Sequence, residues 1–263
     1  MSTTQARLER HGATLVLTFT RPEKRNAISN EMLDLLVEAS NTLASDEAIR
    51  TLVITGEGPY FTAGVDLAGG MAQEMSKPTS APGRHFRSVH RKIHAILDEL
   101  ETIEKPVVLA AQGPCLGLGV ELAASCDFRF ATPATTFALP EINIGVIAGS
   151  GGTGRLVRAI GPAWTKWLGM AGRSVDAEAA LRIGLVHDVY PTDTFTENVF
   201  KFVDDLNALP AEAVGVAKIA IDAAVDSDRV TQRHFERLAC TTLYGSPEFL
   251  ERTARFTKRD PKV

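Results

Sequence analysis

The first half of the chain alternates short apolar runs with amphipathic segments. Residues 13–20 alternate apolar and polar positions and are rich in β-branched residues, which predicts a strand. Residues 30–44 place Met32, Leu35 and Leu36 at helical spacing behind Ser29, a favourable N-cap residue, which predicts a helix. The same reasoning predicts strands at 51–55, 107–111 and 128–131, and helices at 85–102 and 119–126. Strands that alternate with helices favour an α/β fold with parallel pairing.

The second half is mostly helical. Helical spacing covers 154–160, 163–170, 177–183 and 197–206, and one last strand is predicted at 185–190. Beyond about residue 195 only helical patterns follow, with apolar positions at Phe235, Leu238, Leu243, Phe249 and Leu250. These positions can pack either on the core of the same chain or on another copy, and the pattern alone does not separate the two. We therefore predict a core over 1–195 and a helical region over 196–263.

Residues 69–84 interrupt this organisation. The segment is rich in glycine, proline and serine and has no clear period, which predicts a mobile loop.

Composition and charge narrow the function classes. The chain has 263 residues, of which 44% are hydrophobic and 23% charged, as in an ordinary globular protein. Its net charge of −4 argues against a general nucleic-acid binder. No apolar run reaches the length of a membrane span and the N-terminus lacks a signal-peptide core, so we expect a cytoplasmic protein without a membrane partner. Cys115, Cys126 and Cys240 show no disulfide or metal spacing, and we expect all three to be buried.

Two glutamates beside glycine-rich turns carry the candidate chemistry. Glu121 ends the segment 113–121, and Glu141 precedes a run that contains Gly149 and Gly151. Glycine lets a backbone approach a ligand closely and point N–H groups at it. Two carboxylates in one site can share acid and base roles, so the pair predicts proton-transfer catalysis.

Five segments resemble the enoyl-CoA hydratase/isomerase (crotonase) superfamily, in the family's order and spacing. They are 21–27, 61–66, 113–121 with Cys126 and Asp127, 137–156, and 172–186. The resemblance implies a crotonase-like ββα spiral core, followed by a C-terminal α-helical oligomerisation region. It also implies an enoyl-CoA hydratase, of the kind that serves fatty-acid β-oxidation, that adds water to a 2-trans-enoyl-CoA.

The same resemblance assigns catalytic roles. Two backbone N–H donors of an oxyanion hole fall on Val65 and Leu118, and the two carboxylates of hydratases fall on Glu121 and Glu141. Glu121 is expected to orient and activate water, and Glu141 to handle the proton at the α-carbon. Leu118 departs from the glycine of many relatives, but it can still donate its N–H if its φ is negative. Ala148 stands where many hydratases have proline.

The resemblance also implies where the substrate binds. The expected substrate and CoA contacts are Lys24, Arg25, Ala27, Ala63, Gly64, Asp66, Leu67, Gly117, Gly149 and Lys258. The nucleotide end is expected near 21–27 and the pantetheine between Ala63 and Leu118. Coenzyme A is part of the substrate, so no separate cofactor and no metal are expected. A homotrimer or a hexamer is the implied assembly.

Three other motifs are weaker. Residues 149–154 match the dinucleotide fingerprint G-x-G-x-x-G, but no strand or βαβ unit precedes them, so a turn that starts a helix is expected. His90 and His94 have metal-binding spacing, but Arg91 stands where the metalloprotease motif requires glutamate, so a partly solvated helix face is expected. Ser150 lacks the first glycine of a nucleophile elbow.

Two alternative functions stay open. A Δ3,Δ2-enoyl-CoA isomerase needs only one base, whereas this sequence keeps two carboxylates. A non-catalytic acyl-CoA-binding protein needs neither. The preference for acyl-chain length or for aromatic acyl groups depends on residues 69–102, whose arrangement the pattern does not predict.

Overall fold

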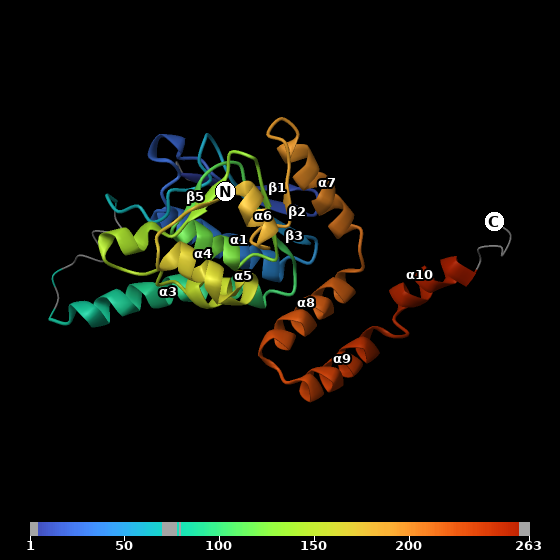
Figure 1. Ribbon diagram of the computed structural model, residues 1–263. Helices are drawn as coiled ribbons and strands as arrows, with labels where there is room; N and C mark the ends of the chain where they lie inside the picture. The colour runs from blue at the N-terminus through green and yellow to red at the C-terminus, as the bar shows by residue number, and fades with distance from the viewer. Residues whose placement is uncertain (1–4, 70–77, 79, 258–263) are drawn as a thin grey trace.

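The computed structural model describes residues 5–69, 78 and 80–257 (Figure 1). Within these residues the main sheet has six strands in the order β1-β2-β3-β4-β6-β9. Their bounds are Ala6–His11, Thr14–Phe19, Thr51–Gly56, Val107–Ala111, Phe128–Ala131 and Asp188–Val189. β1 and β2 pair antiparallel, and the pairs from β2 onward are parallel. The predicted α/β fold with parallel pairing is confirmed.

A second, three-stranded sheet lies beside the main one. Its order is β5-β7-β8, with bounds Cys115–Leu116, Thr136–Ala138 and Val175–Asp176. β5 and β7 run parallel, so the segments that precede Glu121 and Glu141 lie side by side. This pairing brings the two glutamates together across a gap of twenty residues in the sequence.

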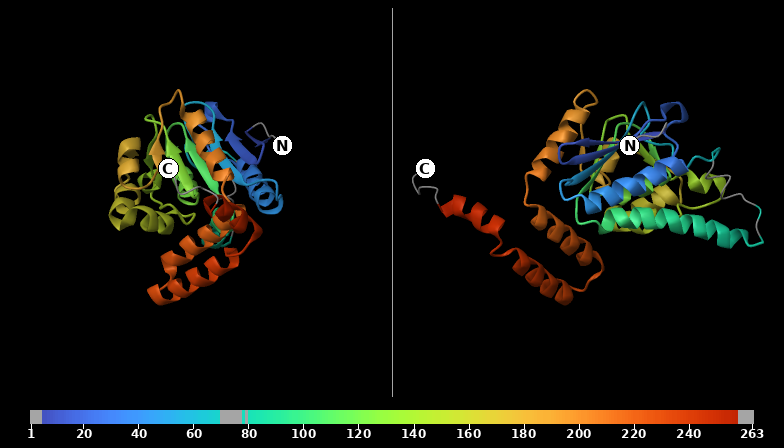
Figure 2. Two further views of the ribbon diagram at one scale, coloured as in Figure 1. Left: turned by 90° about the vertical axis from the view of Figure 1, so that its right-hand side faces the viewer. Right: turned by 180° about the vertical axis from the view of Figure 1, so that it is seen from behind.

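Helices cover both faces of the main sheet (Figures 1 and 2). Their bounds are Asn30–Ser45 for α1, Pro82–Thr102 for α3, Leu118–Ala124 for α4, Gly152–Gly169 for α5, Ala177–Arg182 for α6 and Phe195–Asn207 for α7, with short 3₁₀ helices η1 at Pro22–Lys24 and η2 at Pro140–Ile144. Leu15 and Leu17 of β2 belong to the buried cluster that includes α1 and α3. Val16, between them, belongs to a cluster with Val199 and Val203 of α7. The alternation of strand side chains therefore supplies both cores.

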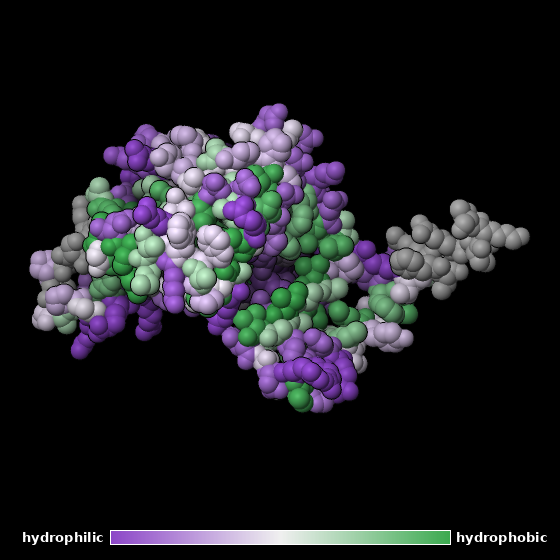
Figure 3. All heavy atoms as spheres, viewed as in Figure 1, coloured by the Kyte–Doolittle hydropathy of each residue, from purple (hydrophilic) through white to green (hydrophobic). Residues whose placement is uncertain are grey.

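Three further helices project from this body. They are α8 at Ala211–Asp226, α9 at Arg229–Leu243 and α10 at Pro247–Thr257 (Figures 1 and 2). Lys218 of α8 donates to Asp127 at 2.9 Å, which ties α8 to the core. α9 has no buried residue among those described, and Leu238 and Tyr244 are 70% and 75% exposed. Hydrophobic residues also gather over α8 in Figure 3.

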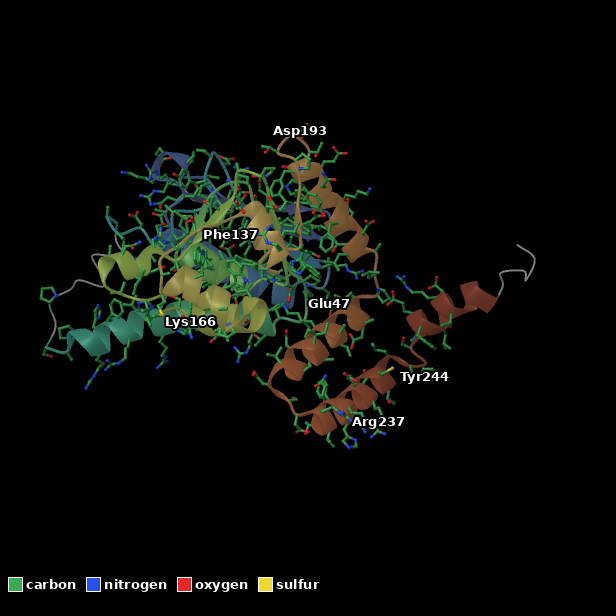
Figure 4. All side chains as sticks on the ribbon, viewed as in Figure 1. Glu47, Phe137, Lys166, Asp193, Arg237 and Tyr244 are labelled. Atoms are coloured by element: carbon green, nitrogen blue, oxygen red, sulfur yellow. The ribbon has the colours of Figure 1, made fainter. Side chains whose placement is uncertain are left out.

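Figure 4 marks the contrast between the two regions, with Phe137 inside the core and Tyr244 out on the projecting helices. The first helix of the predicted C-terminal region, α7, packs on the sheet of its own chain, while α8 to α10 extend away from it. The boundary near residue 195 and the assembly through this region stay predictions.

Several local predictions are confirmed and others need correction. α1 forms as predicted, and the Ser29 side chain accepts a hydrogen bond from the N–H of Met32. The strand β1 was not predicted, because its positions are largely polar and solvent-facing. α3 begins at Pro82 rather than at residue 85, since proline is well suited to a first helical turn, and the predicted loop lies partly outside the described residues. The strand predicted at 185–190 has only two residues in the structure.

Cys240 is exposed, which corrects the expectation that it is buried. None of the described helices is long and apolar enough to span a membrane.

Candidate active site

Glu121 lies inside the protein on the first turn of α4. Gly117, the residue immediately before α4, has φ 57° and ψ −123°, a conformation that residues with a Cβ rarely adopt. This turn directs α4 into the core, and Glu121 is only 3% exposed. A buried carboxylate is costly unless hydrogen bonds compensate for the lost water.

Two backbone N–H groups compensate Glu121. Oε1 accepts hydrogen bonds from the N–H of Ser150 at 2.7 Å and from the N–H of Gly152 at 3.1 Å. Burial raises the pKa of Glu121, while these N–H groups and the nearby His94 and Arg155 oppose the rise. Both donors bind Oε1, and no hydrogen bond within the described residues goes to the other oxygen, Oε2.

Glu141 lies opposite, in the first turn of η2. Its Oε2 is buried and has no hydrogen-bond partner within the described residues. Its Oε1 approaches Gly117 so closely that a Cβ added there would lie 2.8 Å away. Burial raises the pKa of Glu141, and the negative charge of Glu121 raises it further. An orphaned, buried carboxyl oxygen of this kind is typical of a group aimed at a substrate.

Two backbone segments meet beside this pair. A Cβ on Gly64 would lie 2.9 Å from the carbonyl oxygen of Leu116, so only glycine allows this approach. Val65 forms a parallel β-bridge with Ile28. The N–H of Ile28 donates to the carbonyl oxygen of Gly64, and its carbonyl oxygen accepts from the N–H of Asp66. The N–H of Val65 itself therefore points away from Ile28. Leu118 opens α4, where an N–H has no partner within the helix. Neither N–H has a hydrogen-bond acceptor within the described part of the chain.

Leu118, which stands where many relatives have glycine, has a backbone conformation that is ordinary for leucine. It is absent from the non-glycine residues with positive φ, and Gly117 takes that conformation instead. Its side chain is buried in the core, at 2% exposure. Because the side chain points into the core and the backbone is unstrained, leucine at this position does not prevent the N–H from donating to a ligand.

The residues predicted to hold CoA occupy one edge of this site. Arg25 and Asn26 both take left-handed φ values, and the guanidinium of Arg25 lies 5.4 Å from the centre of the Tyr60 ring. The N–H of Ala63 donates to the carbonyl oxygen of Arg25 at 2.9 Å, which joins the turn to the Val65 segment. Lys24 is exposed.

The remaining predicted contacts differ in their surroundings. Asp66 is buried and its carboxylate pairs with Arg21 at 2.6 Å, which holds the pKa of Asp66 below its usual range despite burial. Leu67 is 63% exposed, and Ala27 and Gly149 are half-buried. Lys258 lies outside the described residues. The roles of these residues toward a substrate stay predictions.

Sequence reasoning did not find the residues behind Glu121. His90 and His94, on one face of α3, are half-buried, as expected of a partly solvated face, and they also lie against the turn 149–151. Arg155 of α5 is 7% exposed and donates to the carbonyl oxygen of Ser150 at 3.3 Å. The i, i+4 spacing of the histidines is the available signal, but by itself this spacing suggests metal binding and does not identify the turn as the partner. Within the described residues no group of three or more side chains could hold a metal ion.

The turn 149–152 starts a helix, as predicted, rather than binding a dinucleotide after a strand. α5 begins at Gly152, and Gly151 precedes it with φ 90°. Its N–H groups are directed at Glu121 of the same chain.

A mixed α/β fold with two neighbouring carboxylates, one buried and one half-buried, is an arrangement typical of enzymes that move protons. The sequence pattern of the family described as "Enoyl-CoA hydratase/isomerase" matches residues 9–262. A 2,3-dehydroadipyl-CoA hydratase from Escherichia coli is 34% identical over 81% of this chain and 80% of its own length. A short-chain-enoyl-CoA hydratase from Clostridium acetobutylicum is 30% identical over 96% of this chain and 94% of its own.

Solved structures agree with these relatives. The structure of an enoyl-CoA hydratase subunit I from Geobacillus kaustophilus has a TM-score of 0.87 at 32% identity, and the match covers 98% of this chain and 97% of that one. The chain belongs to the enoyl-CoA hydratase/isomerase family, with the crotonase fold, and is an enzyme of the enoyl-CoA hydratase type.

Proposed function

We propose that this protein adds water across the double bond of a 2-trans-enoyl-CoA to give a 3-hydroxyacyl-CoA. The observation that carries the proposal is a pair of neighbouring carboxylates, Glu121, which is buried, and Glu141, which is half-buried with one buried oxygen. They lie beside two backbone N–H groups that have no acceptor within the described residues. Water addition needs a base, an acid and a site for negative charge, and this arrangement can supply all three.

The environments of the two carboxylates suggest which is which. Glu121 accepts two N–H hydrogen bonds, which favour its charged form, so it acts as the base toward water. Glu141 has a buried oxygen without a partner and faces the charge of Glu121, which favours its protonated form, so it acts as the acid. This division matches the roles that the family resemblance implies.

In the reaction, the oxygen of water bonds to the β-carbon as Glu121 takes one of its protons. The electrons of the C=C bond move onto the thioester oxygen as an enolate, which the N–H groups of Val65 and Leu118 stabilise. The enolate then collapses, and its α-carbon takes the proton of Glu141. One proton transfer from Glu121 to Glu141 restores the starting state. Each N–H donor of such a site is worth about 3–4 kcal/mol in the transition state.

The same proposal includes where CoA binds and how the subunits assemble. The nucleotide end of CoA binds near Lys24 and Arg25, and the pantetheine passes between Ala63 and Leu118. The exposed apolar residues of α8 to α10, including Leu238 and Leu250, are covered by further copies in a homotrimer or hexamer. Their exposure supports an interface.

Hydration of crotonyl-CoA, followed as loss of enoyl absorbance, tests the function. Glu121→Gln and Glu141→Gln keep the size of each side chain and remove its proton transfer, so each should slow hydration by about 10²–10⁴-fold while CoA binding is kept. Double-bond migration that responds to only one of the two changes would instead identify an isomerase. Wild-type hydration by a folded Glu141→Gln protein would refute the assignment.

A further inference from the structure

The turn that donates to Glu121 is itself held by a side chain of another helix. The Nε2–H of His94, on α3, donates to the carbonyl oxygen of Gly149 at 2.8 Å. The next residue, Ser150, supplies the 2.7 Å hydrogen bond to Oε1 of Glu121. One residue therefore separates the anchor on α3 from the donor to the carboxylate.

The packing of the turn leaves it little freedom. A Cβ added to Gly151 would lie 3.2 Å from the His94 ring and 2.4 Å from Nη1 of Arg155, so both side chains lie directly on the backbone of this residue. Arg155 donates to the carbonyl oxygen of Ser150 and forms ion pairs with Asp98 and Glu101 of α3. His90, one turn earlier on α3, also lies on this turn: a Cβ added to Gly149 would lie 2.9 Å from its ring, and its Nδ1 lies 3.4 Å from Oγ of Ser150. The 2.8 Å hydrogen bond of His94 holds the backbone carbonyl at the start of the turn.

We propose that His94 is a positioning residue for Glu121: by holding the carbonyl oxygen of Gly149 it fixes the turn 149–152, whose N–H groups bind Oε1 and leave Oε2 facing water. The inference rests on the proposed hydration. A carboxylate held by two N–H groups cannot rotate without breaking both bonds. A turn released from α3 can shift, and the carboxylate then loses its alignment with the substrate. Catalysis is sensitive to such shifts, because a misplacement of about 1 Å can cost about 100-fold in rate.

The charged and titratable groups that face Glu121 come from three elements. They are His94 of α3, Arg155 of α5 and Glu141 of η2. Loss of the hydrogen bonds from the turn removes an interaction that favours the carboxylate form of Glu121, so its pKa should rise. The acidic limb of the pH profile should then move to higher pH. A residue that served only folding would not move this limb.

The experiment compares His94→Ala with His94→Gln, whose side-chain amide can donate to the same carbonyl oxygen. We expect His94→Ala to lower kcat for crotonyl-CoA by about 10- to 100-fold with little change in KM, and to move the acidic limb upward. His94→Gln should restore most of kcat and the wild-type limb. His187→Ala is the matched control, because it removes another histidine-to-backbone hydrogen bond, to the N–H of Arg129, away from this site.

A measurement without substrate separates this inference from the proposed function. The infrared carboxyl band of Glu121 is isolated by subtracting the spectrum of the Glu121→Gln protein, in the wild-type, His94→Ala and His94→Gln backgrounds. A titration shifted upward in His94→Ala and returned by His94→Gln supports positioning, even if the wild type hydrates no enoyl-CoA. The inference is overturned if His94→Ala titrates like the wild type, or if His94→Gln behaves like His94→Ala, which would assign the effect to the charge of the imidazole.

Discussion

Replacing Gly152 with alanine should displace Glu121 while leaving the chemical identity of its side chain unchanged. A Cβ at this position would lie 2.3 Å from Cγ and 2.9 Å from Cβ of Glu121, whereas ordinary contacts begin at 3.4 Å. The glutamate and α5 must therefore separate by about 1 Å, and a displacement of that size can cost about 100-fold in rate. Overpacking a buried site should also lower the free energy of unfolding by about 1–3 kcal/mol.

The assay is crotonyl-CoA hydration together with denaturant unfolding, with Gly154→Ala as the matched control. Gly154 lies in the same turn of α5, is exposed, and a Cβ there would meet only Arg158, at 3.7 Å. Because alanine favours a helix over glycine, this control should be more stable by about 0.5–1 kcal/mol, with unchanged activity. The reasoning is refuted if folded Gly152→Ala protein hydrates as fast as Gly154→Ala protein.

Three further outcomes are expected. The pKa values of Glu121 and Glu141 are raised by burial above the ordinary 4.5, so the acidic limb of kcat/KM should lie above pH 4.5, and a limb at or below it would contradict the site electrostatics. Lys24→Ala combined with Arg25→Ala should weaken CoA binding by about 1–2 kcal/mol and reduce its salt dependence, as measured by calorimetry at two ionic strengths. Sizing in solution should give a species larger than the 28.3 kDa chain, and a clean monomer would end the assembly proposal.

Buried carboxylates with raised pKa values also affect stability. In the folded protein Glu121 holds its proton to higher pH than in the unfolded chain, so between the two pKa values the folded state binds more protons. Stability from this group is therefore fully present below the unfolded pKa and falls as pH rises through the folded pKa. Glu121→Gln should lack this fall, so its unfolding midpoint relative to the wild type should rise across that pH window.

Local patterns in the sequence were sufficient for much of the fold. The cap at Ser29 and the apolar spacing behind it specify α1, because both act within one or two turns of the chain. The buried strands β3 and β4 were likewise visible as short apolar runs bounded by polar residues. Glu121 and Glu141 were found from glycine-rich motifs and family resemblance, which mark positions but give no distances.

Only the tertiary structure decided how these residues act. The two-residue strand β5 and the three-residue strand β7 are too short to show a period, so their pairing, which brings the two glutamates together, depends on contacts distant in sequence. In the sequence, His94 is only one polar position on a predicted amphipathic helix. Its hydrogen bond to Gly149, 55 residues away, arises only because α3 and the turn before α5 pack together. Helical spacing tells which side chains share a face, but the partner of that face is set by the packing of the whole chain.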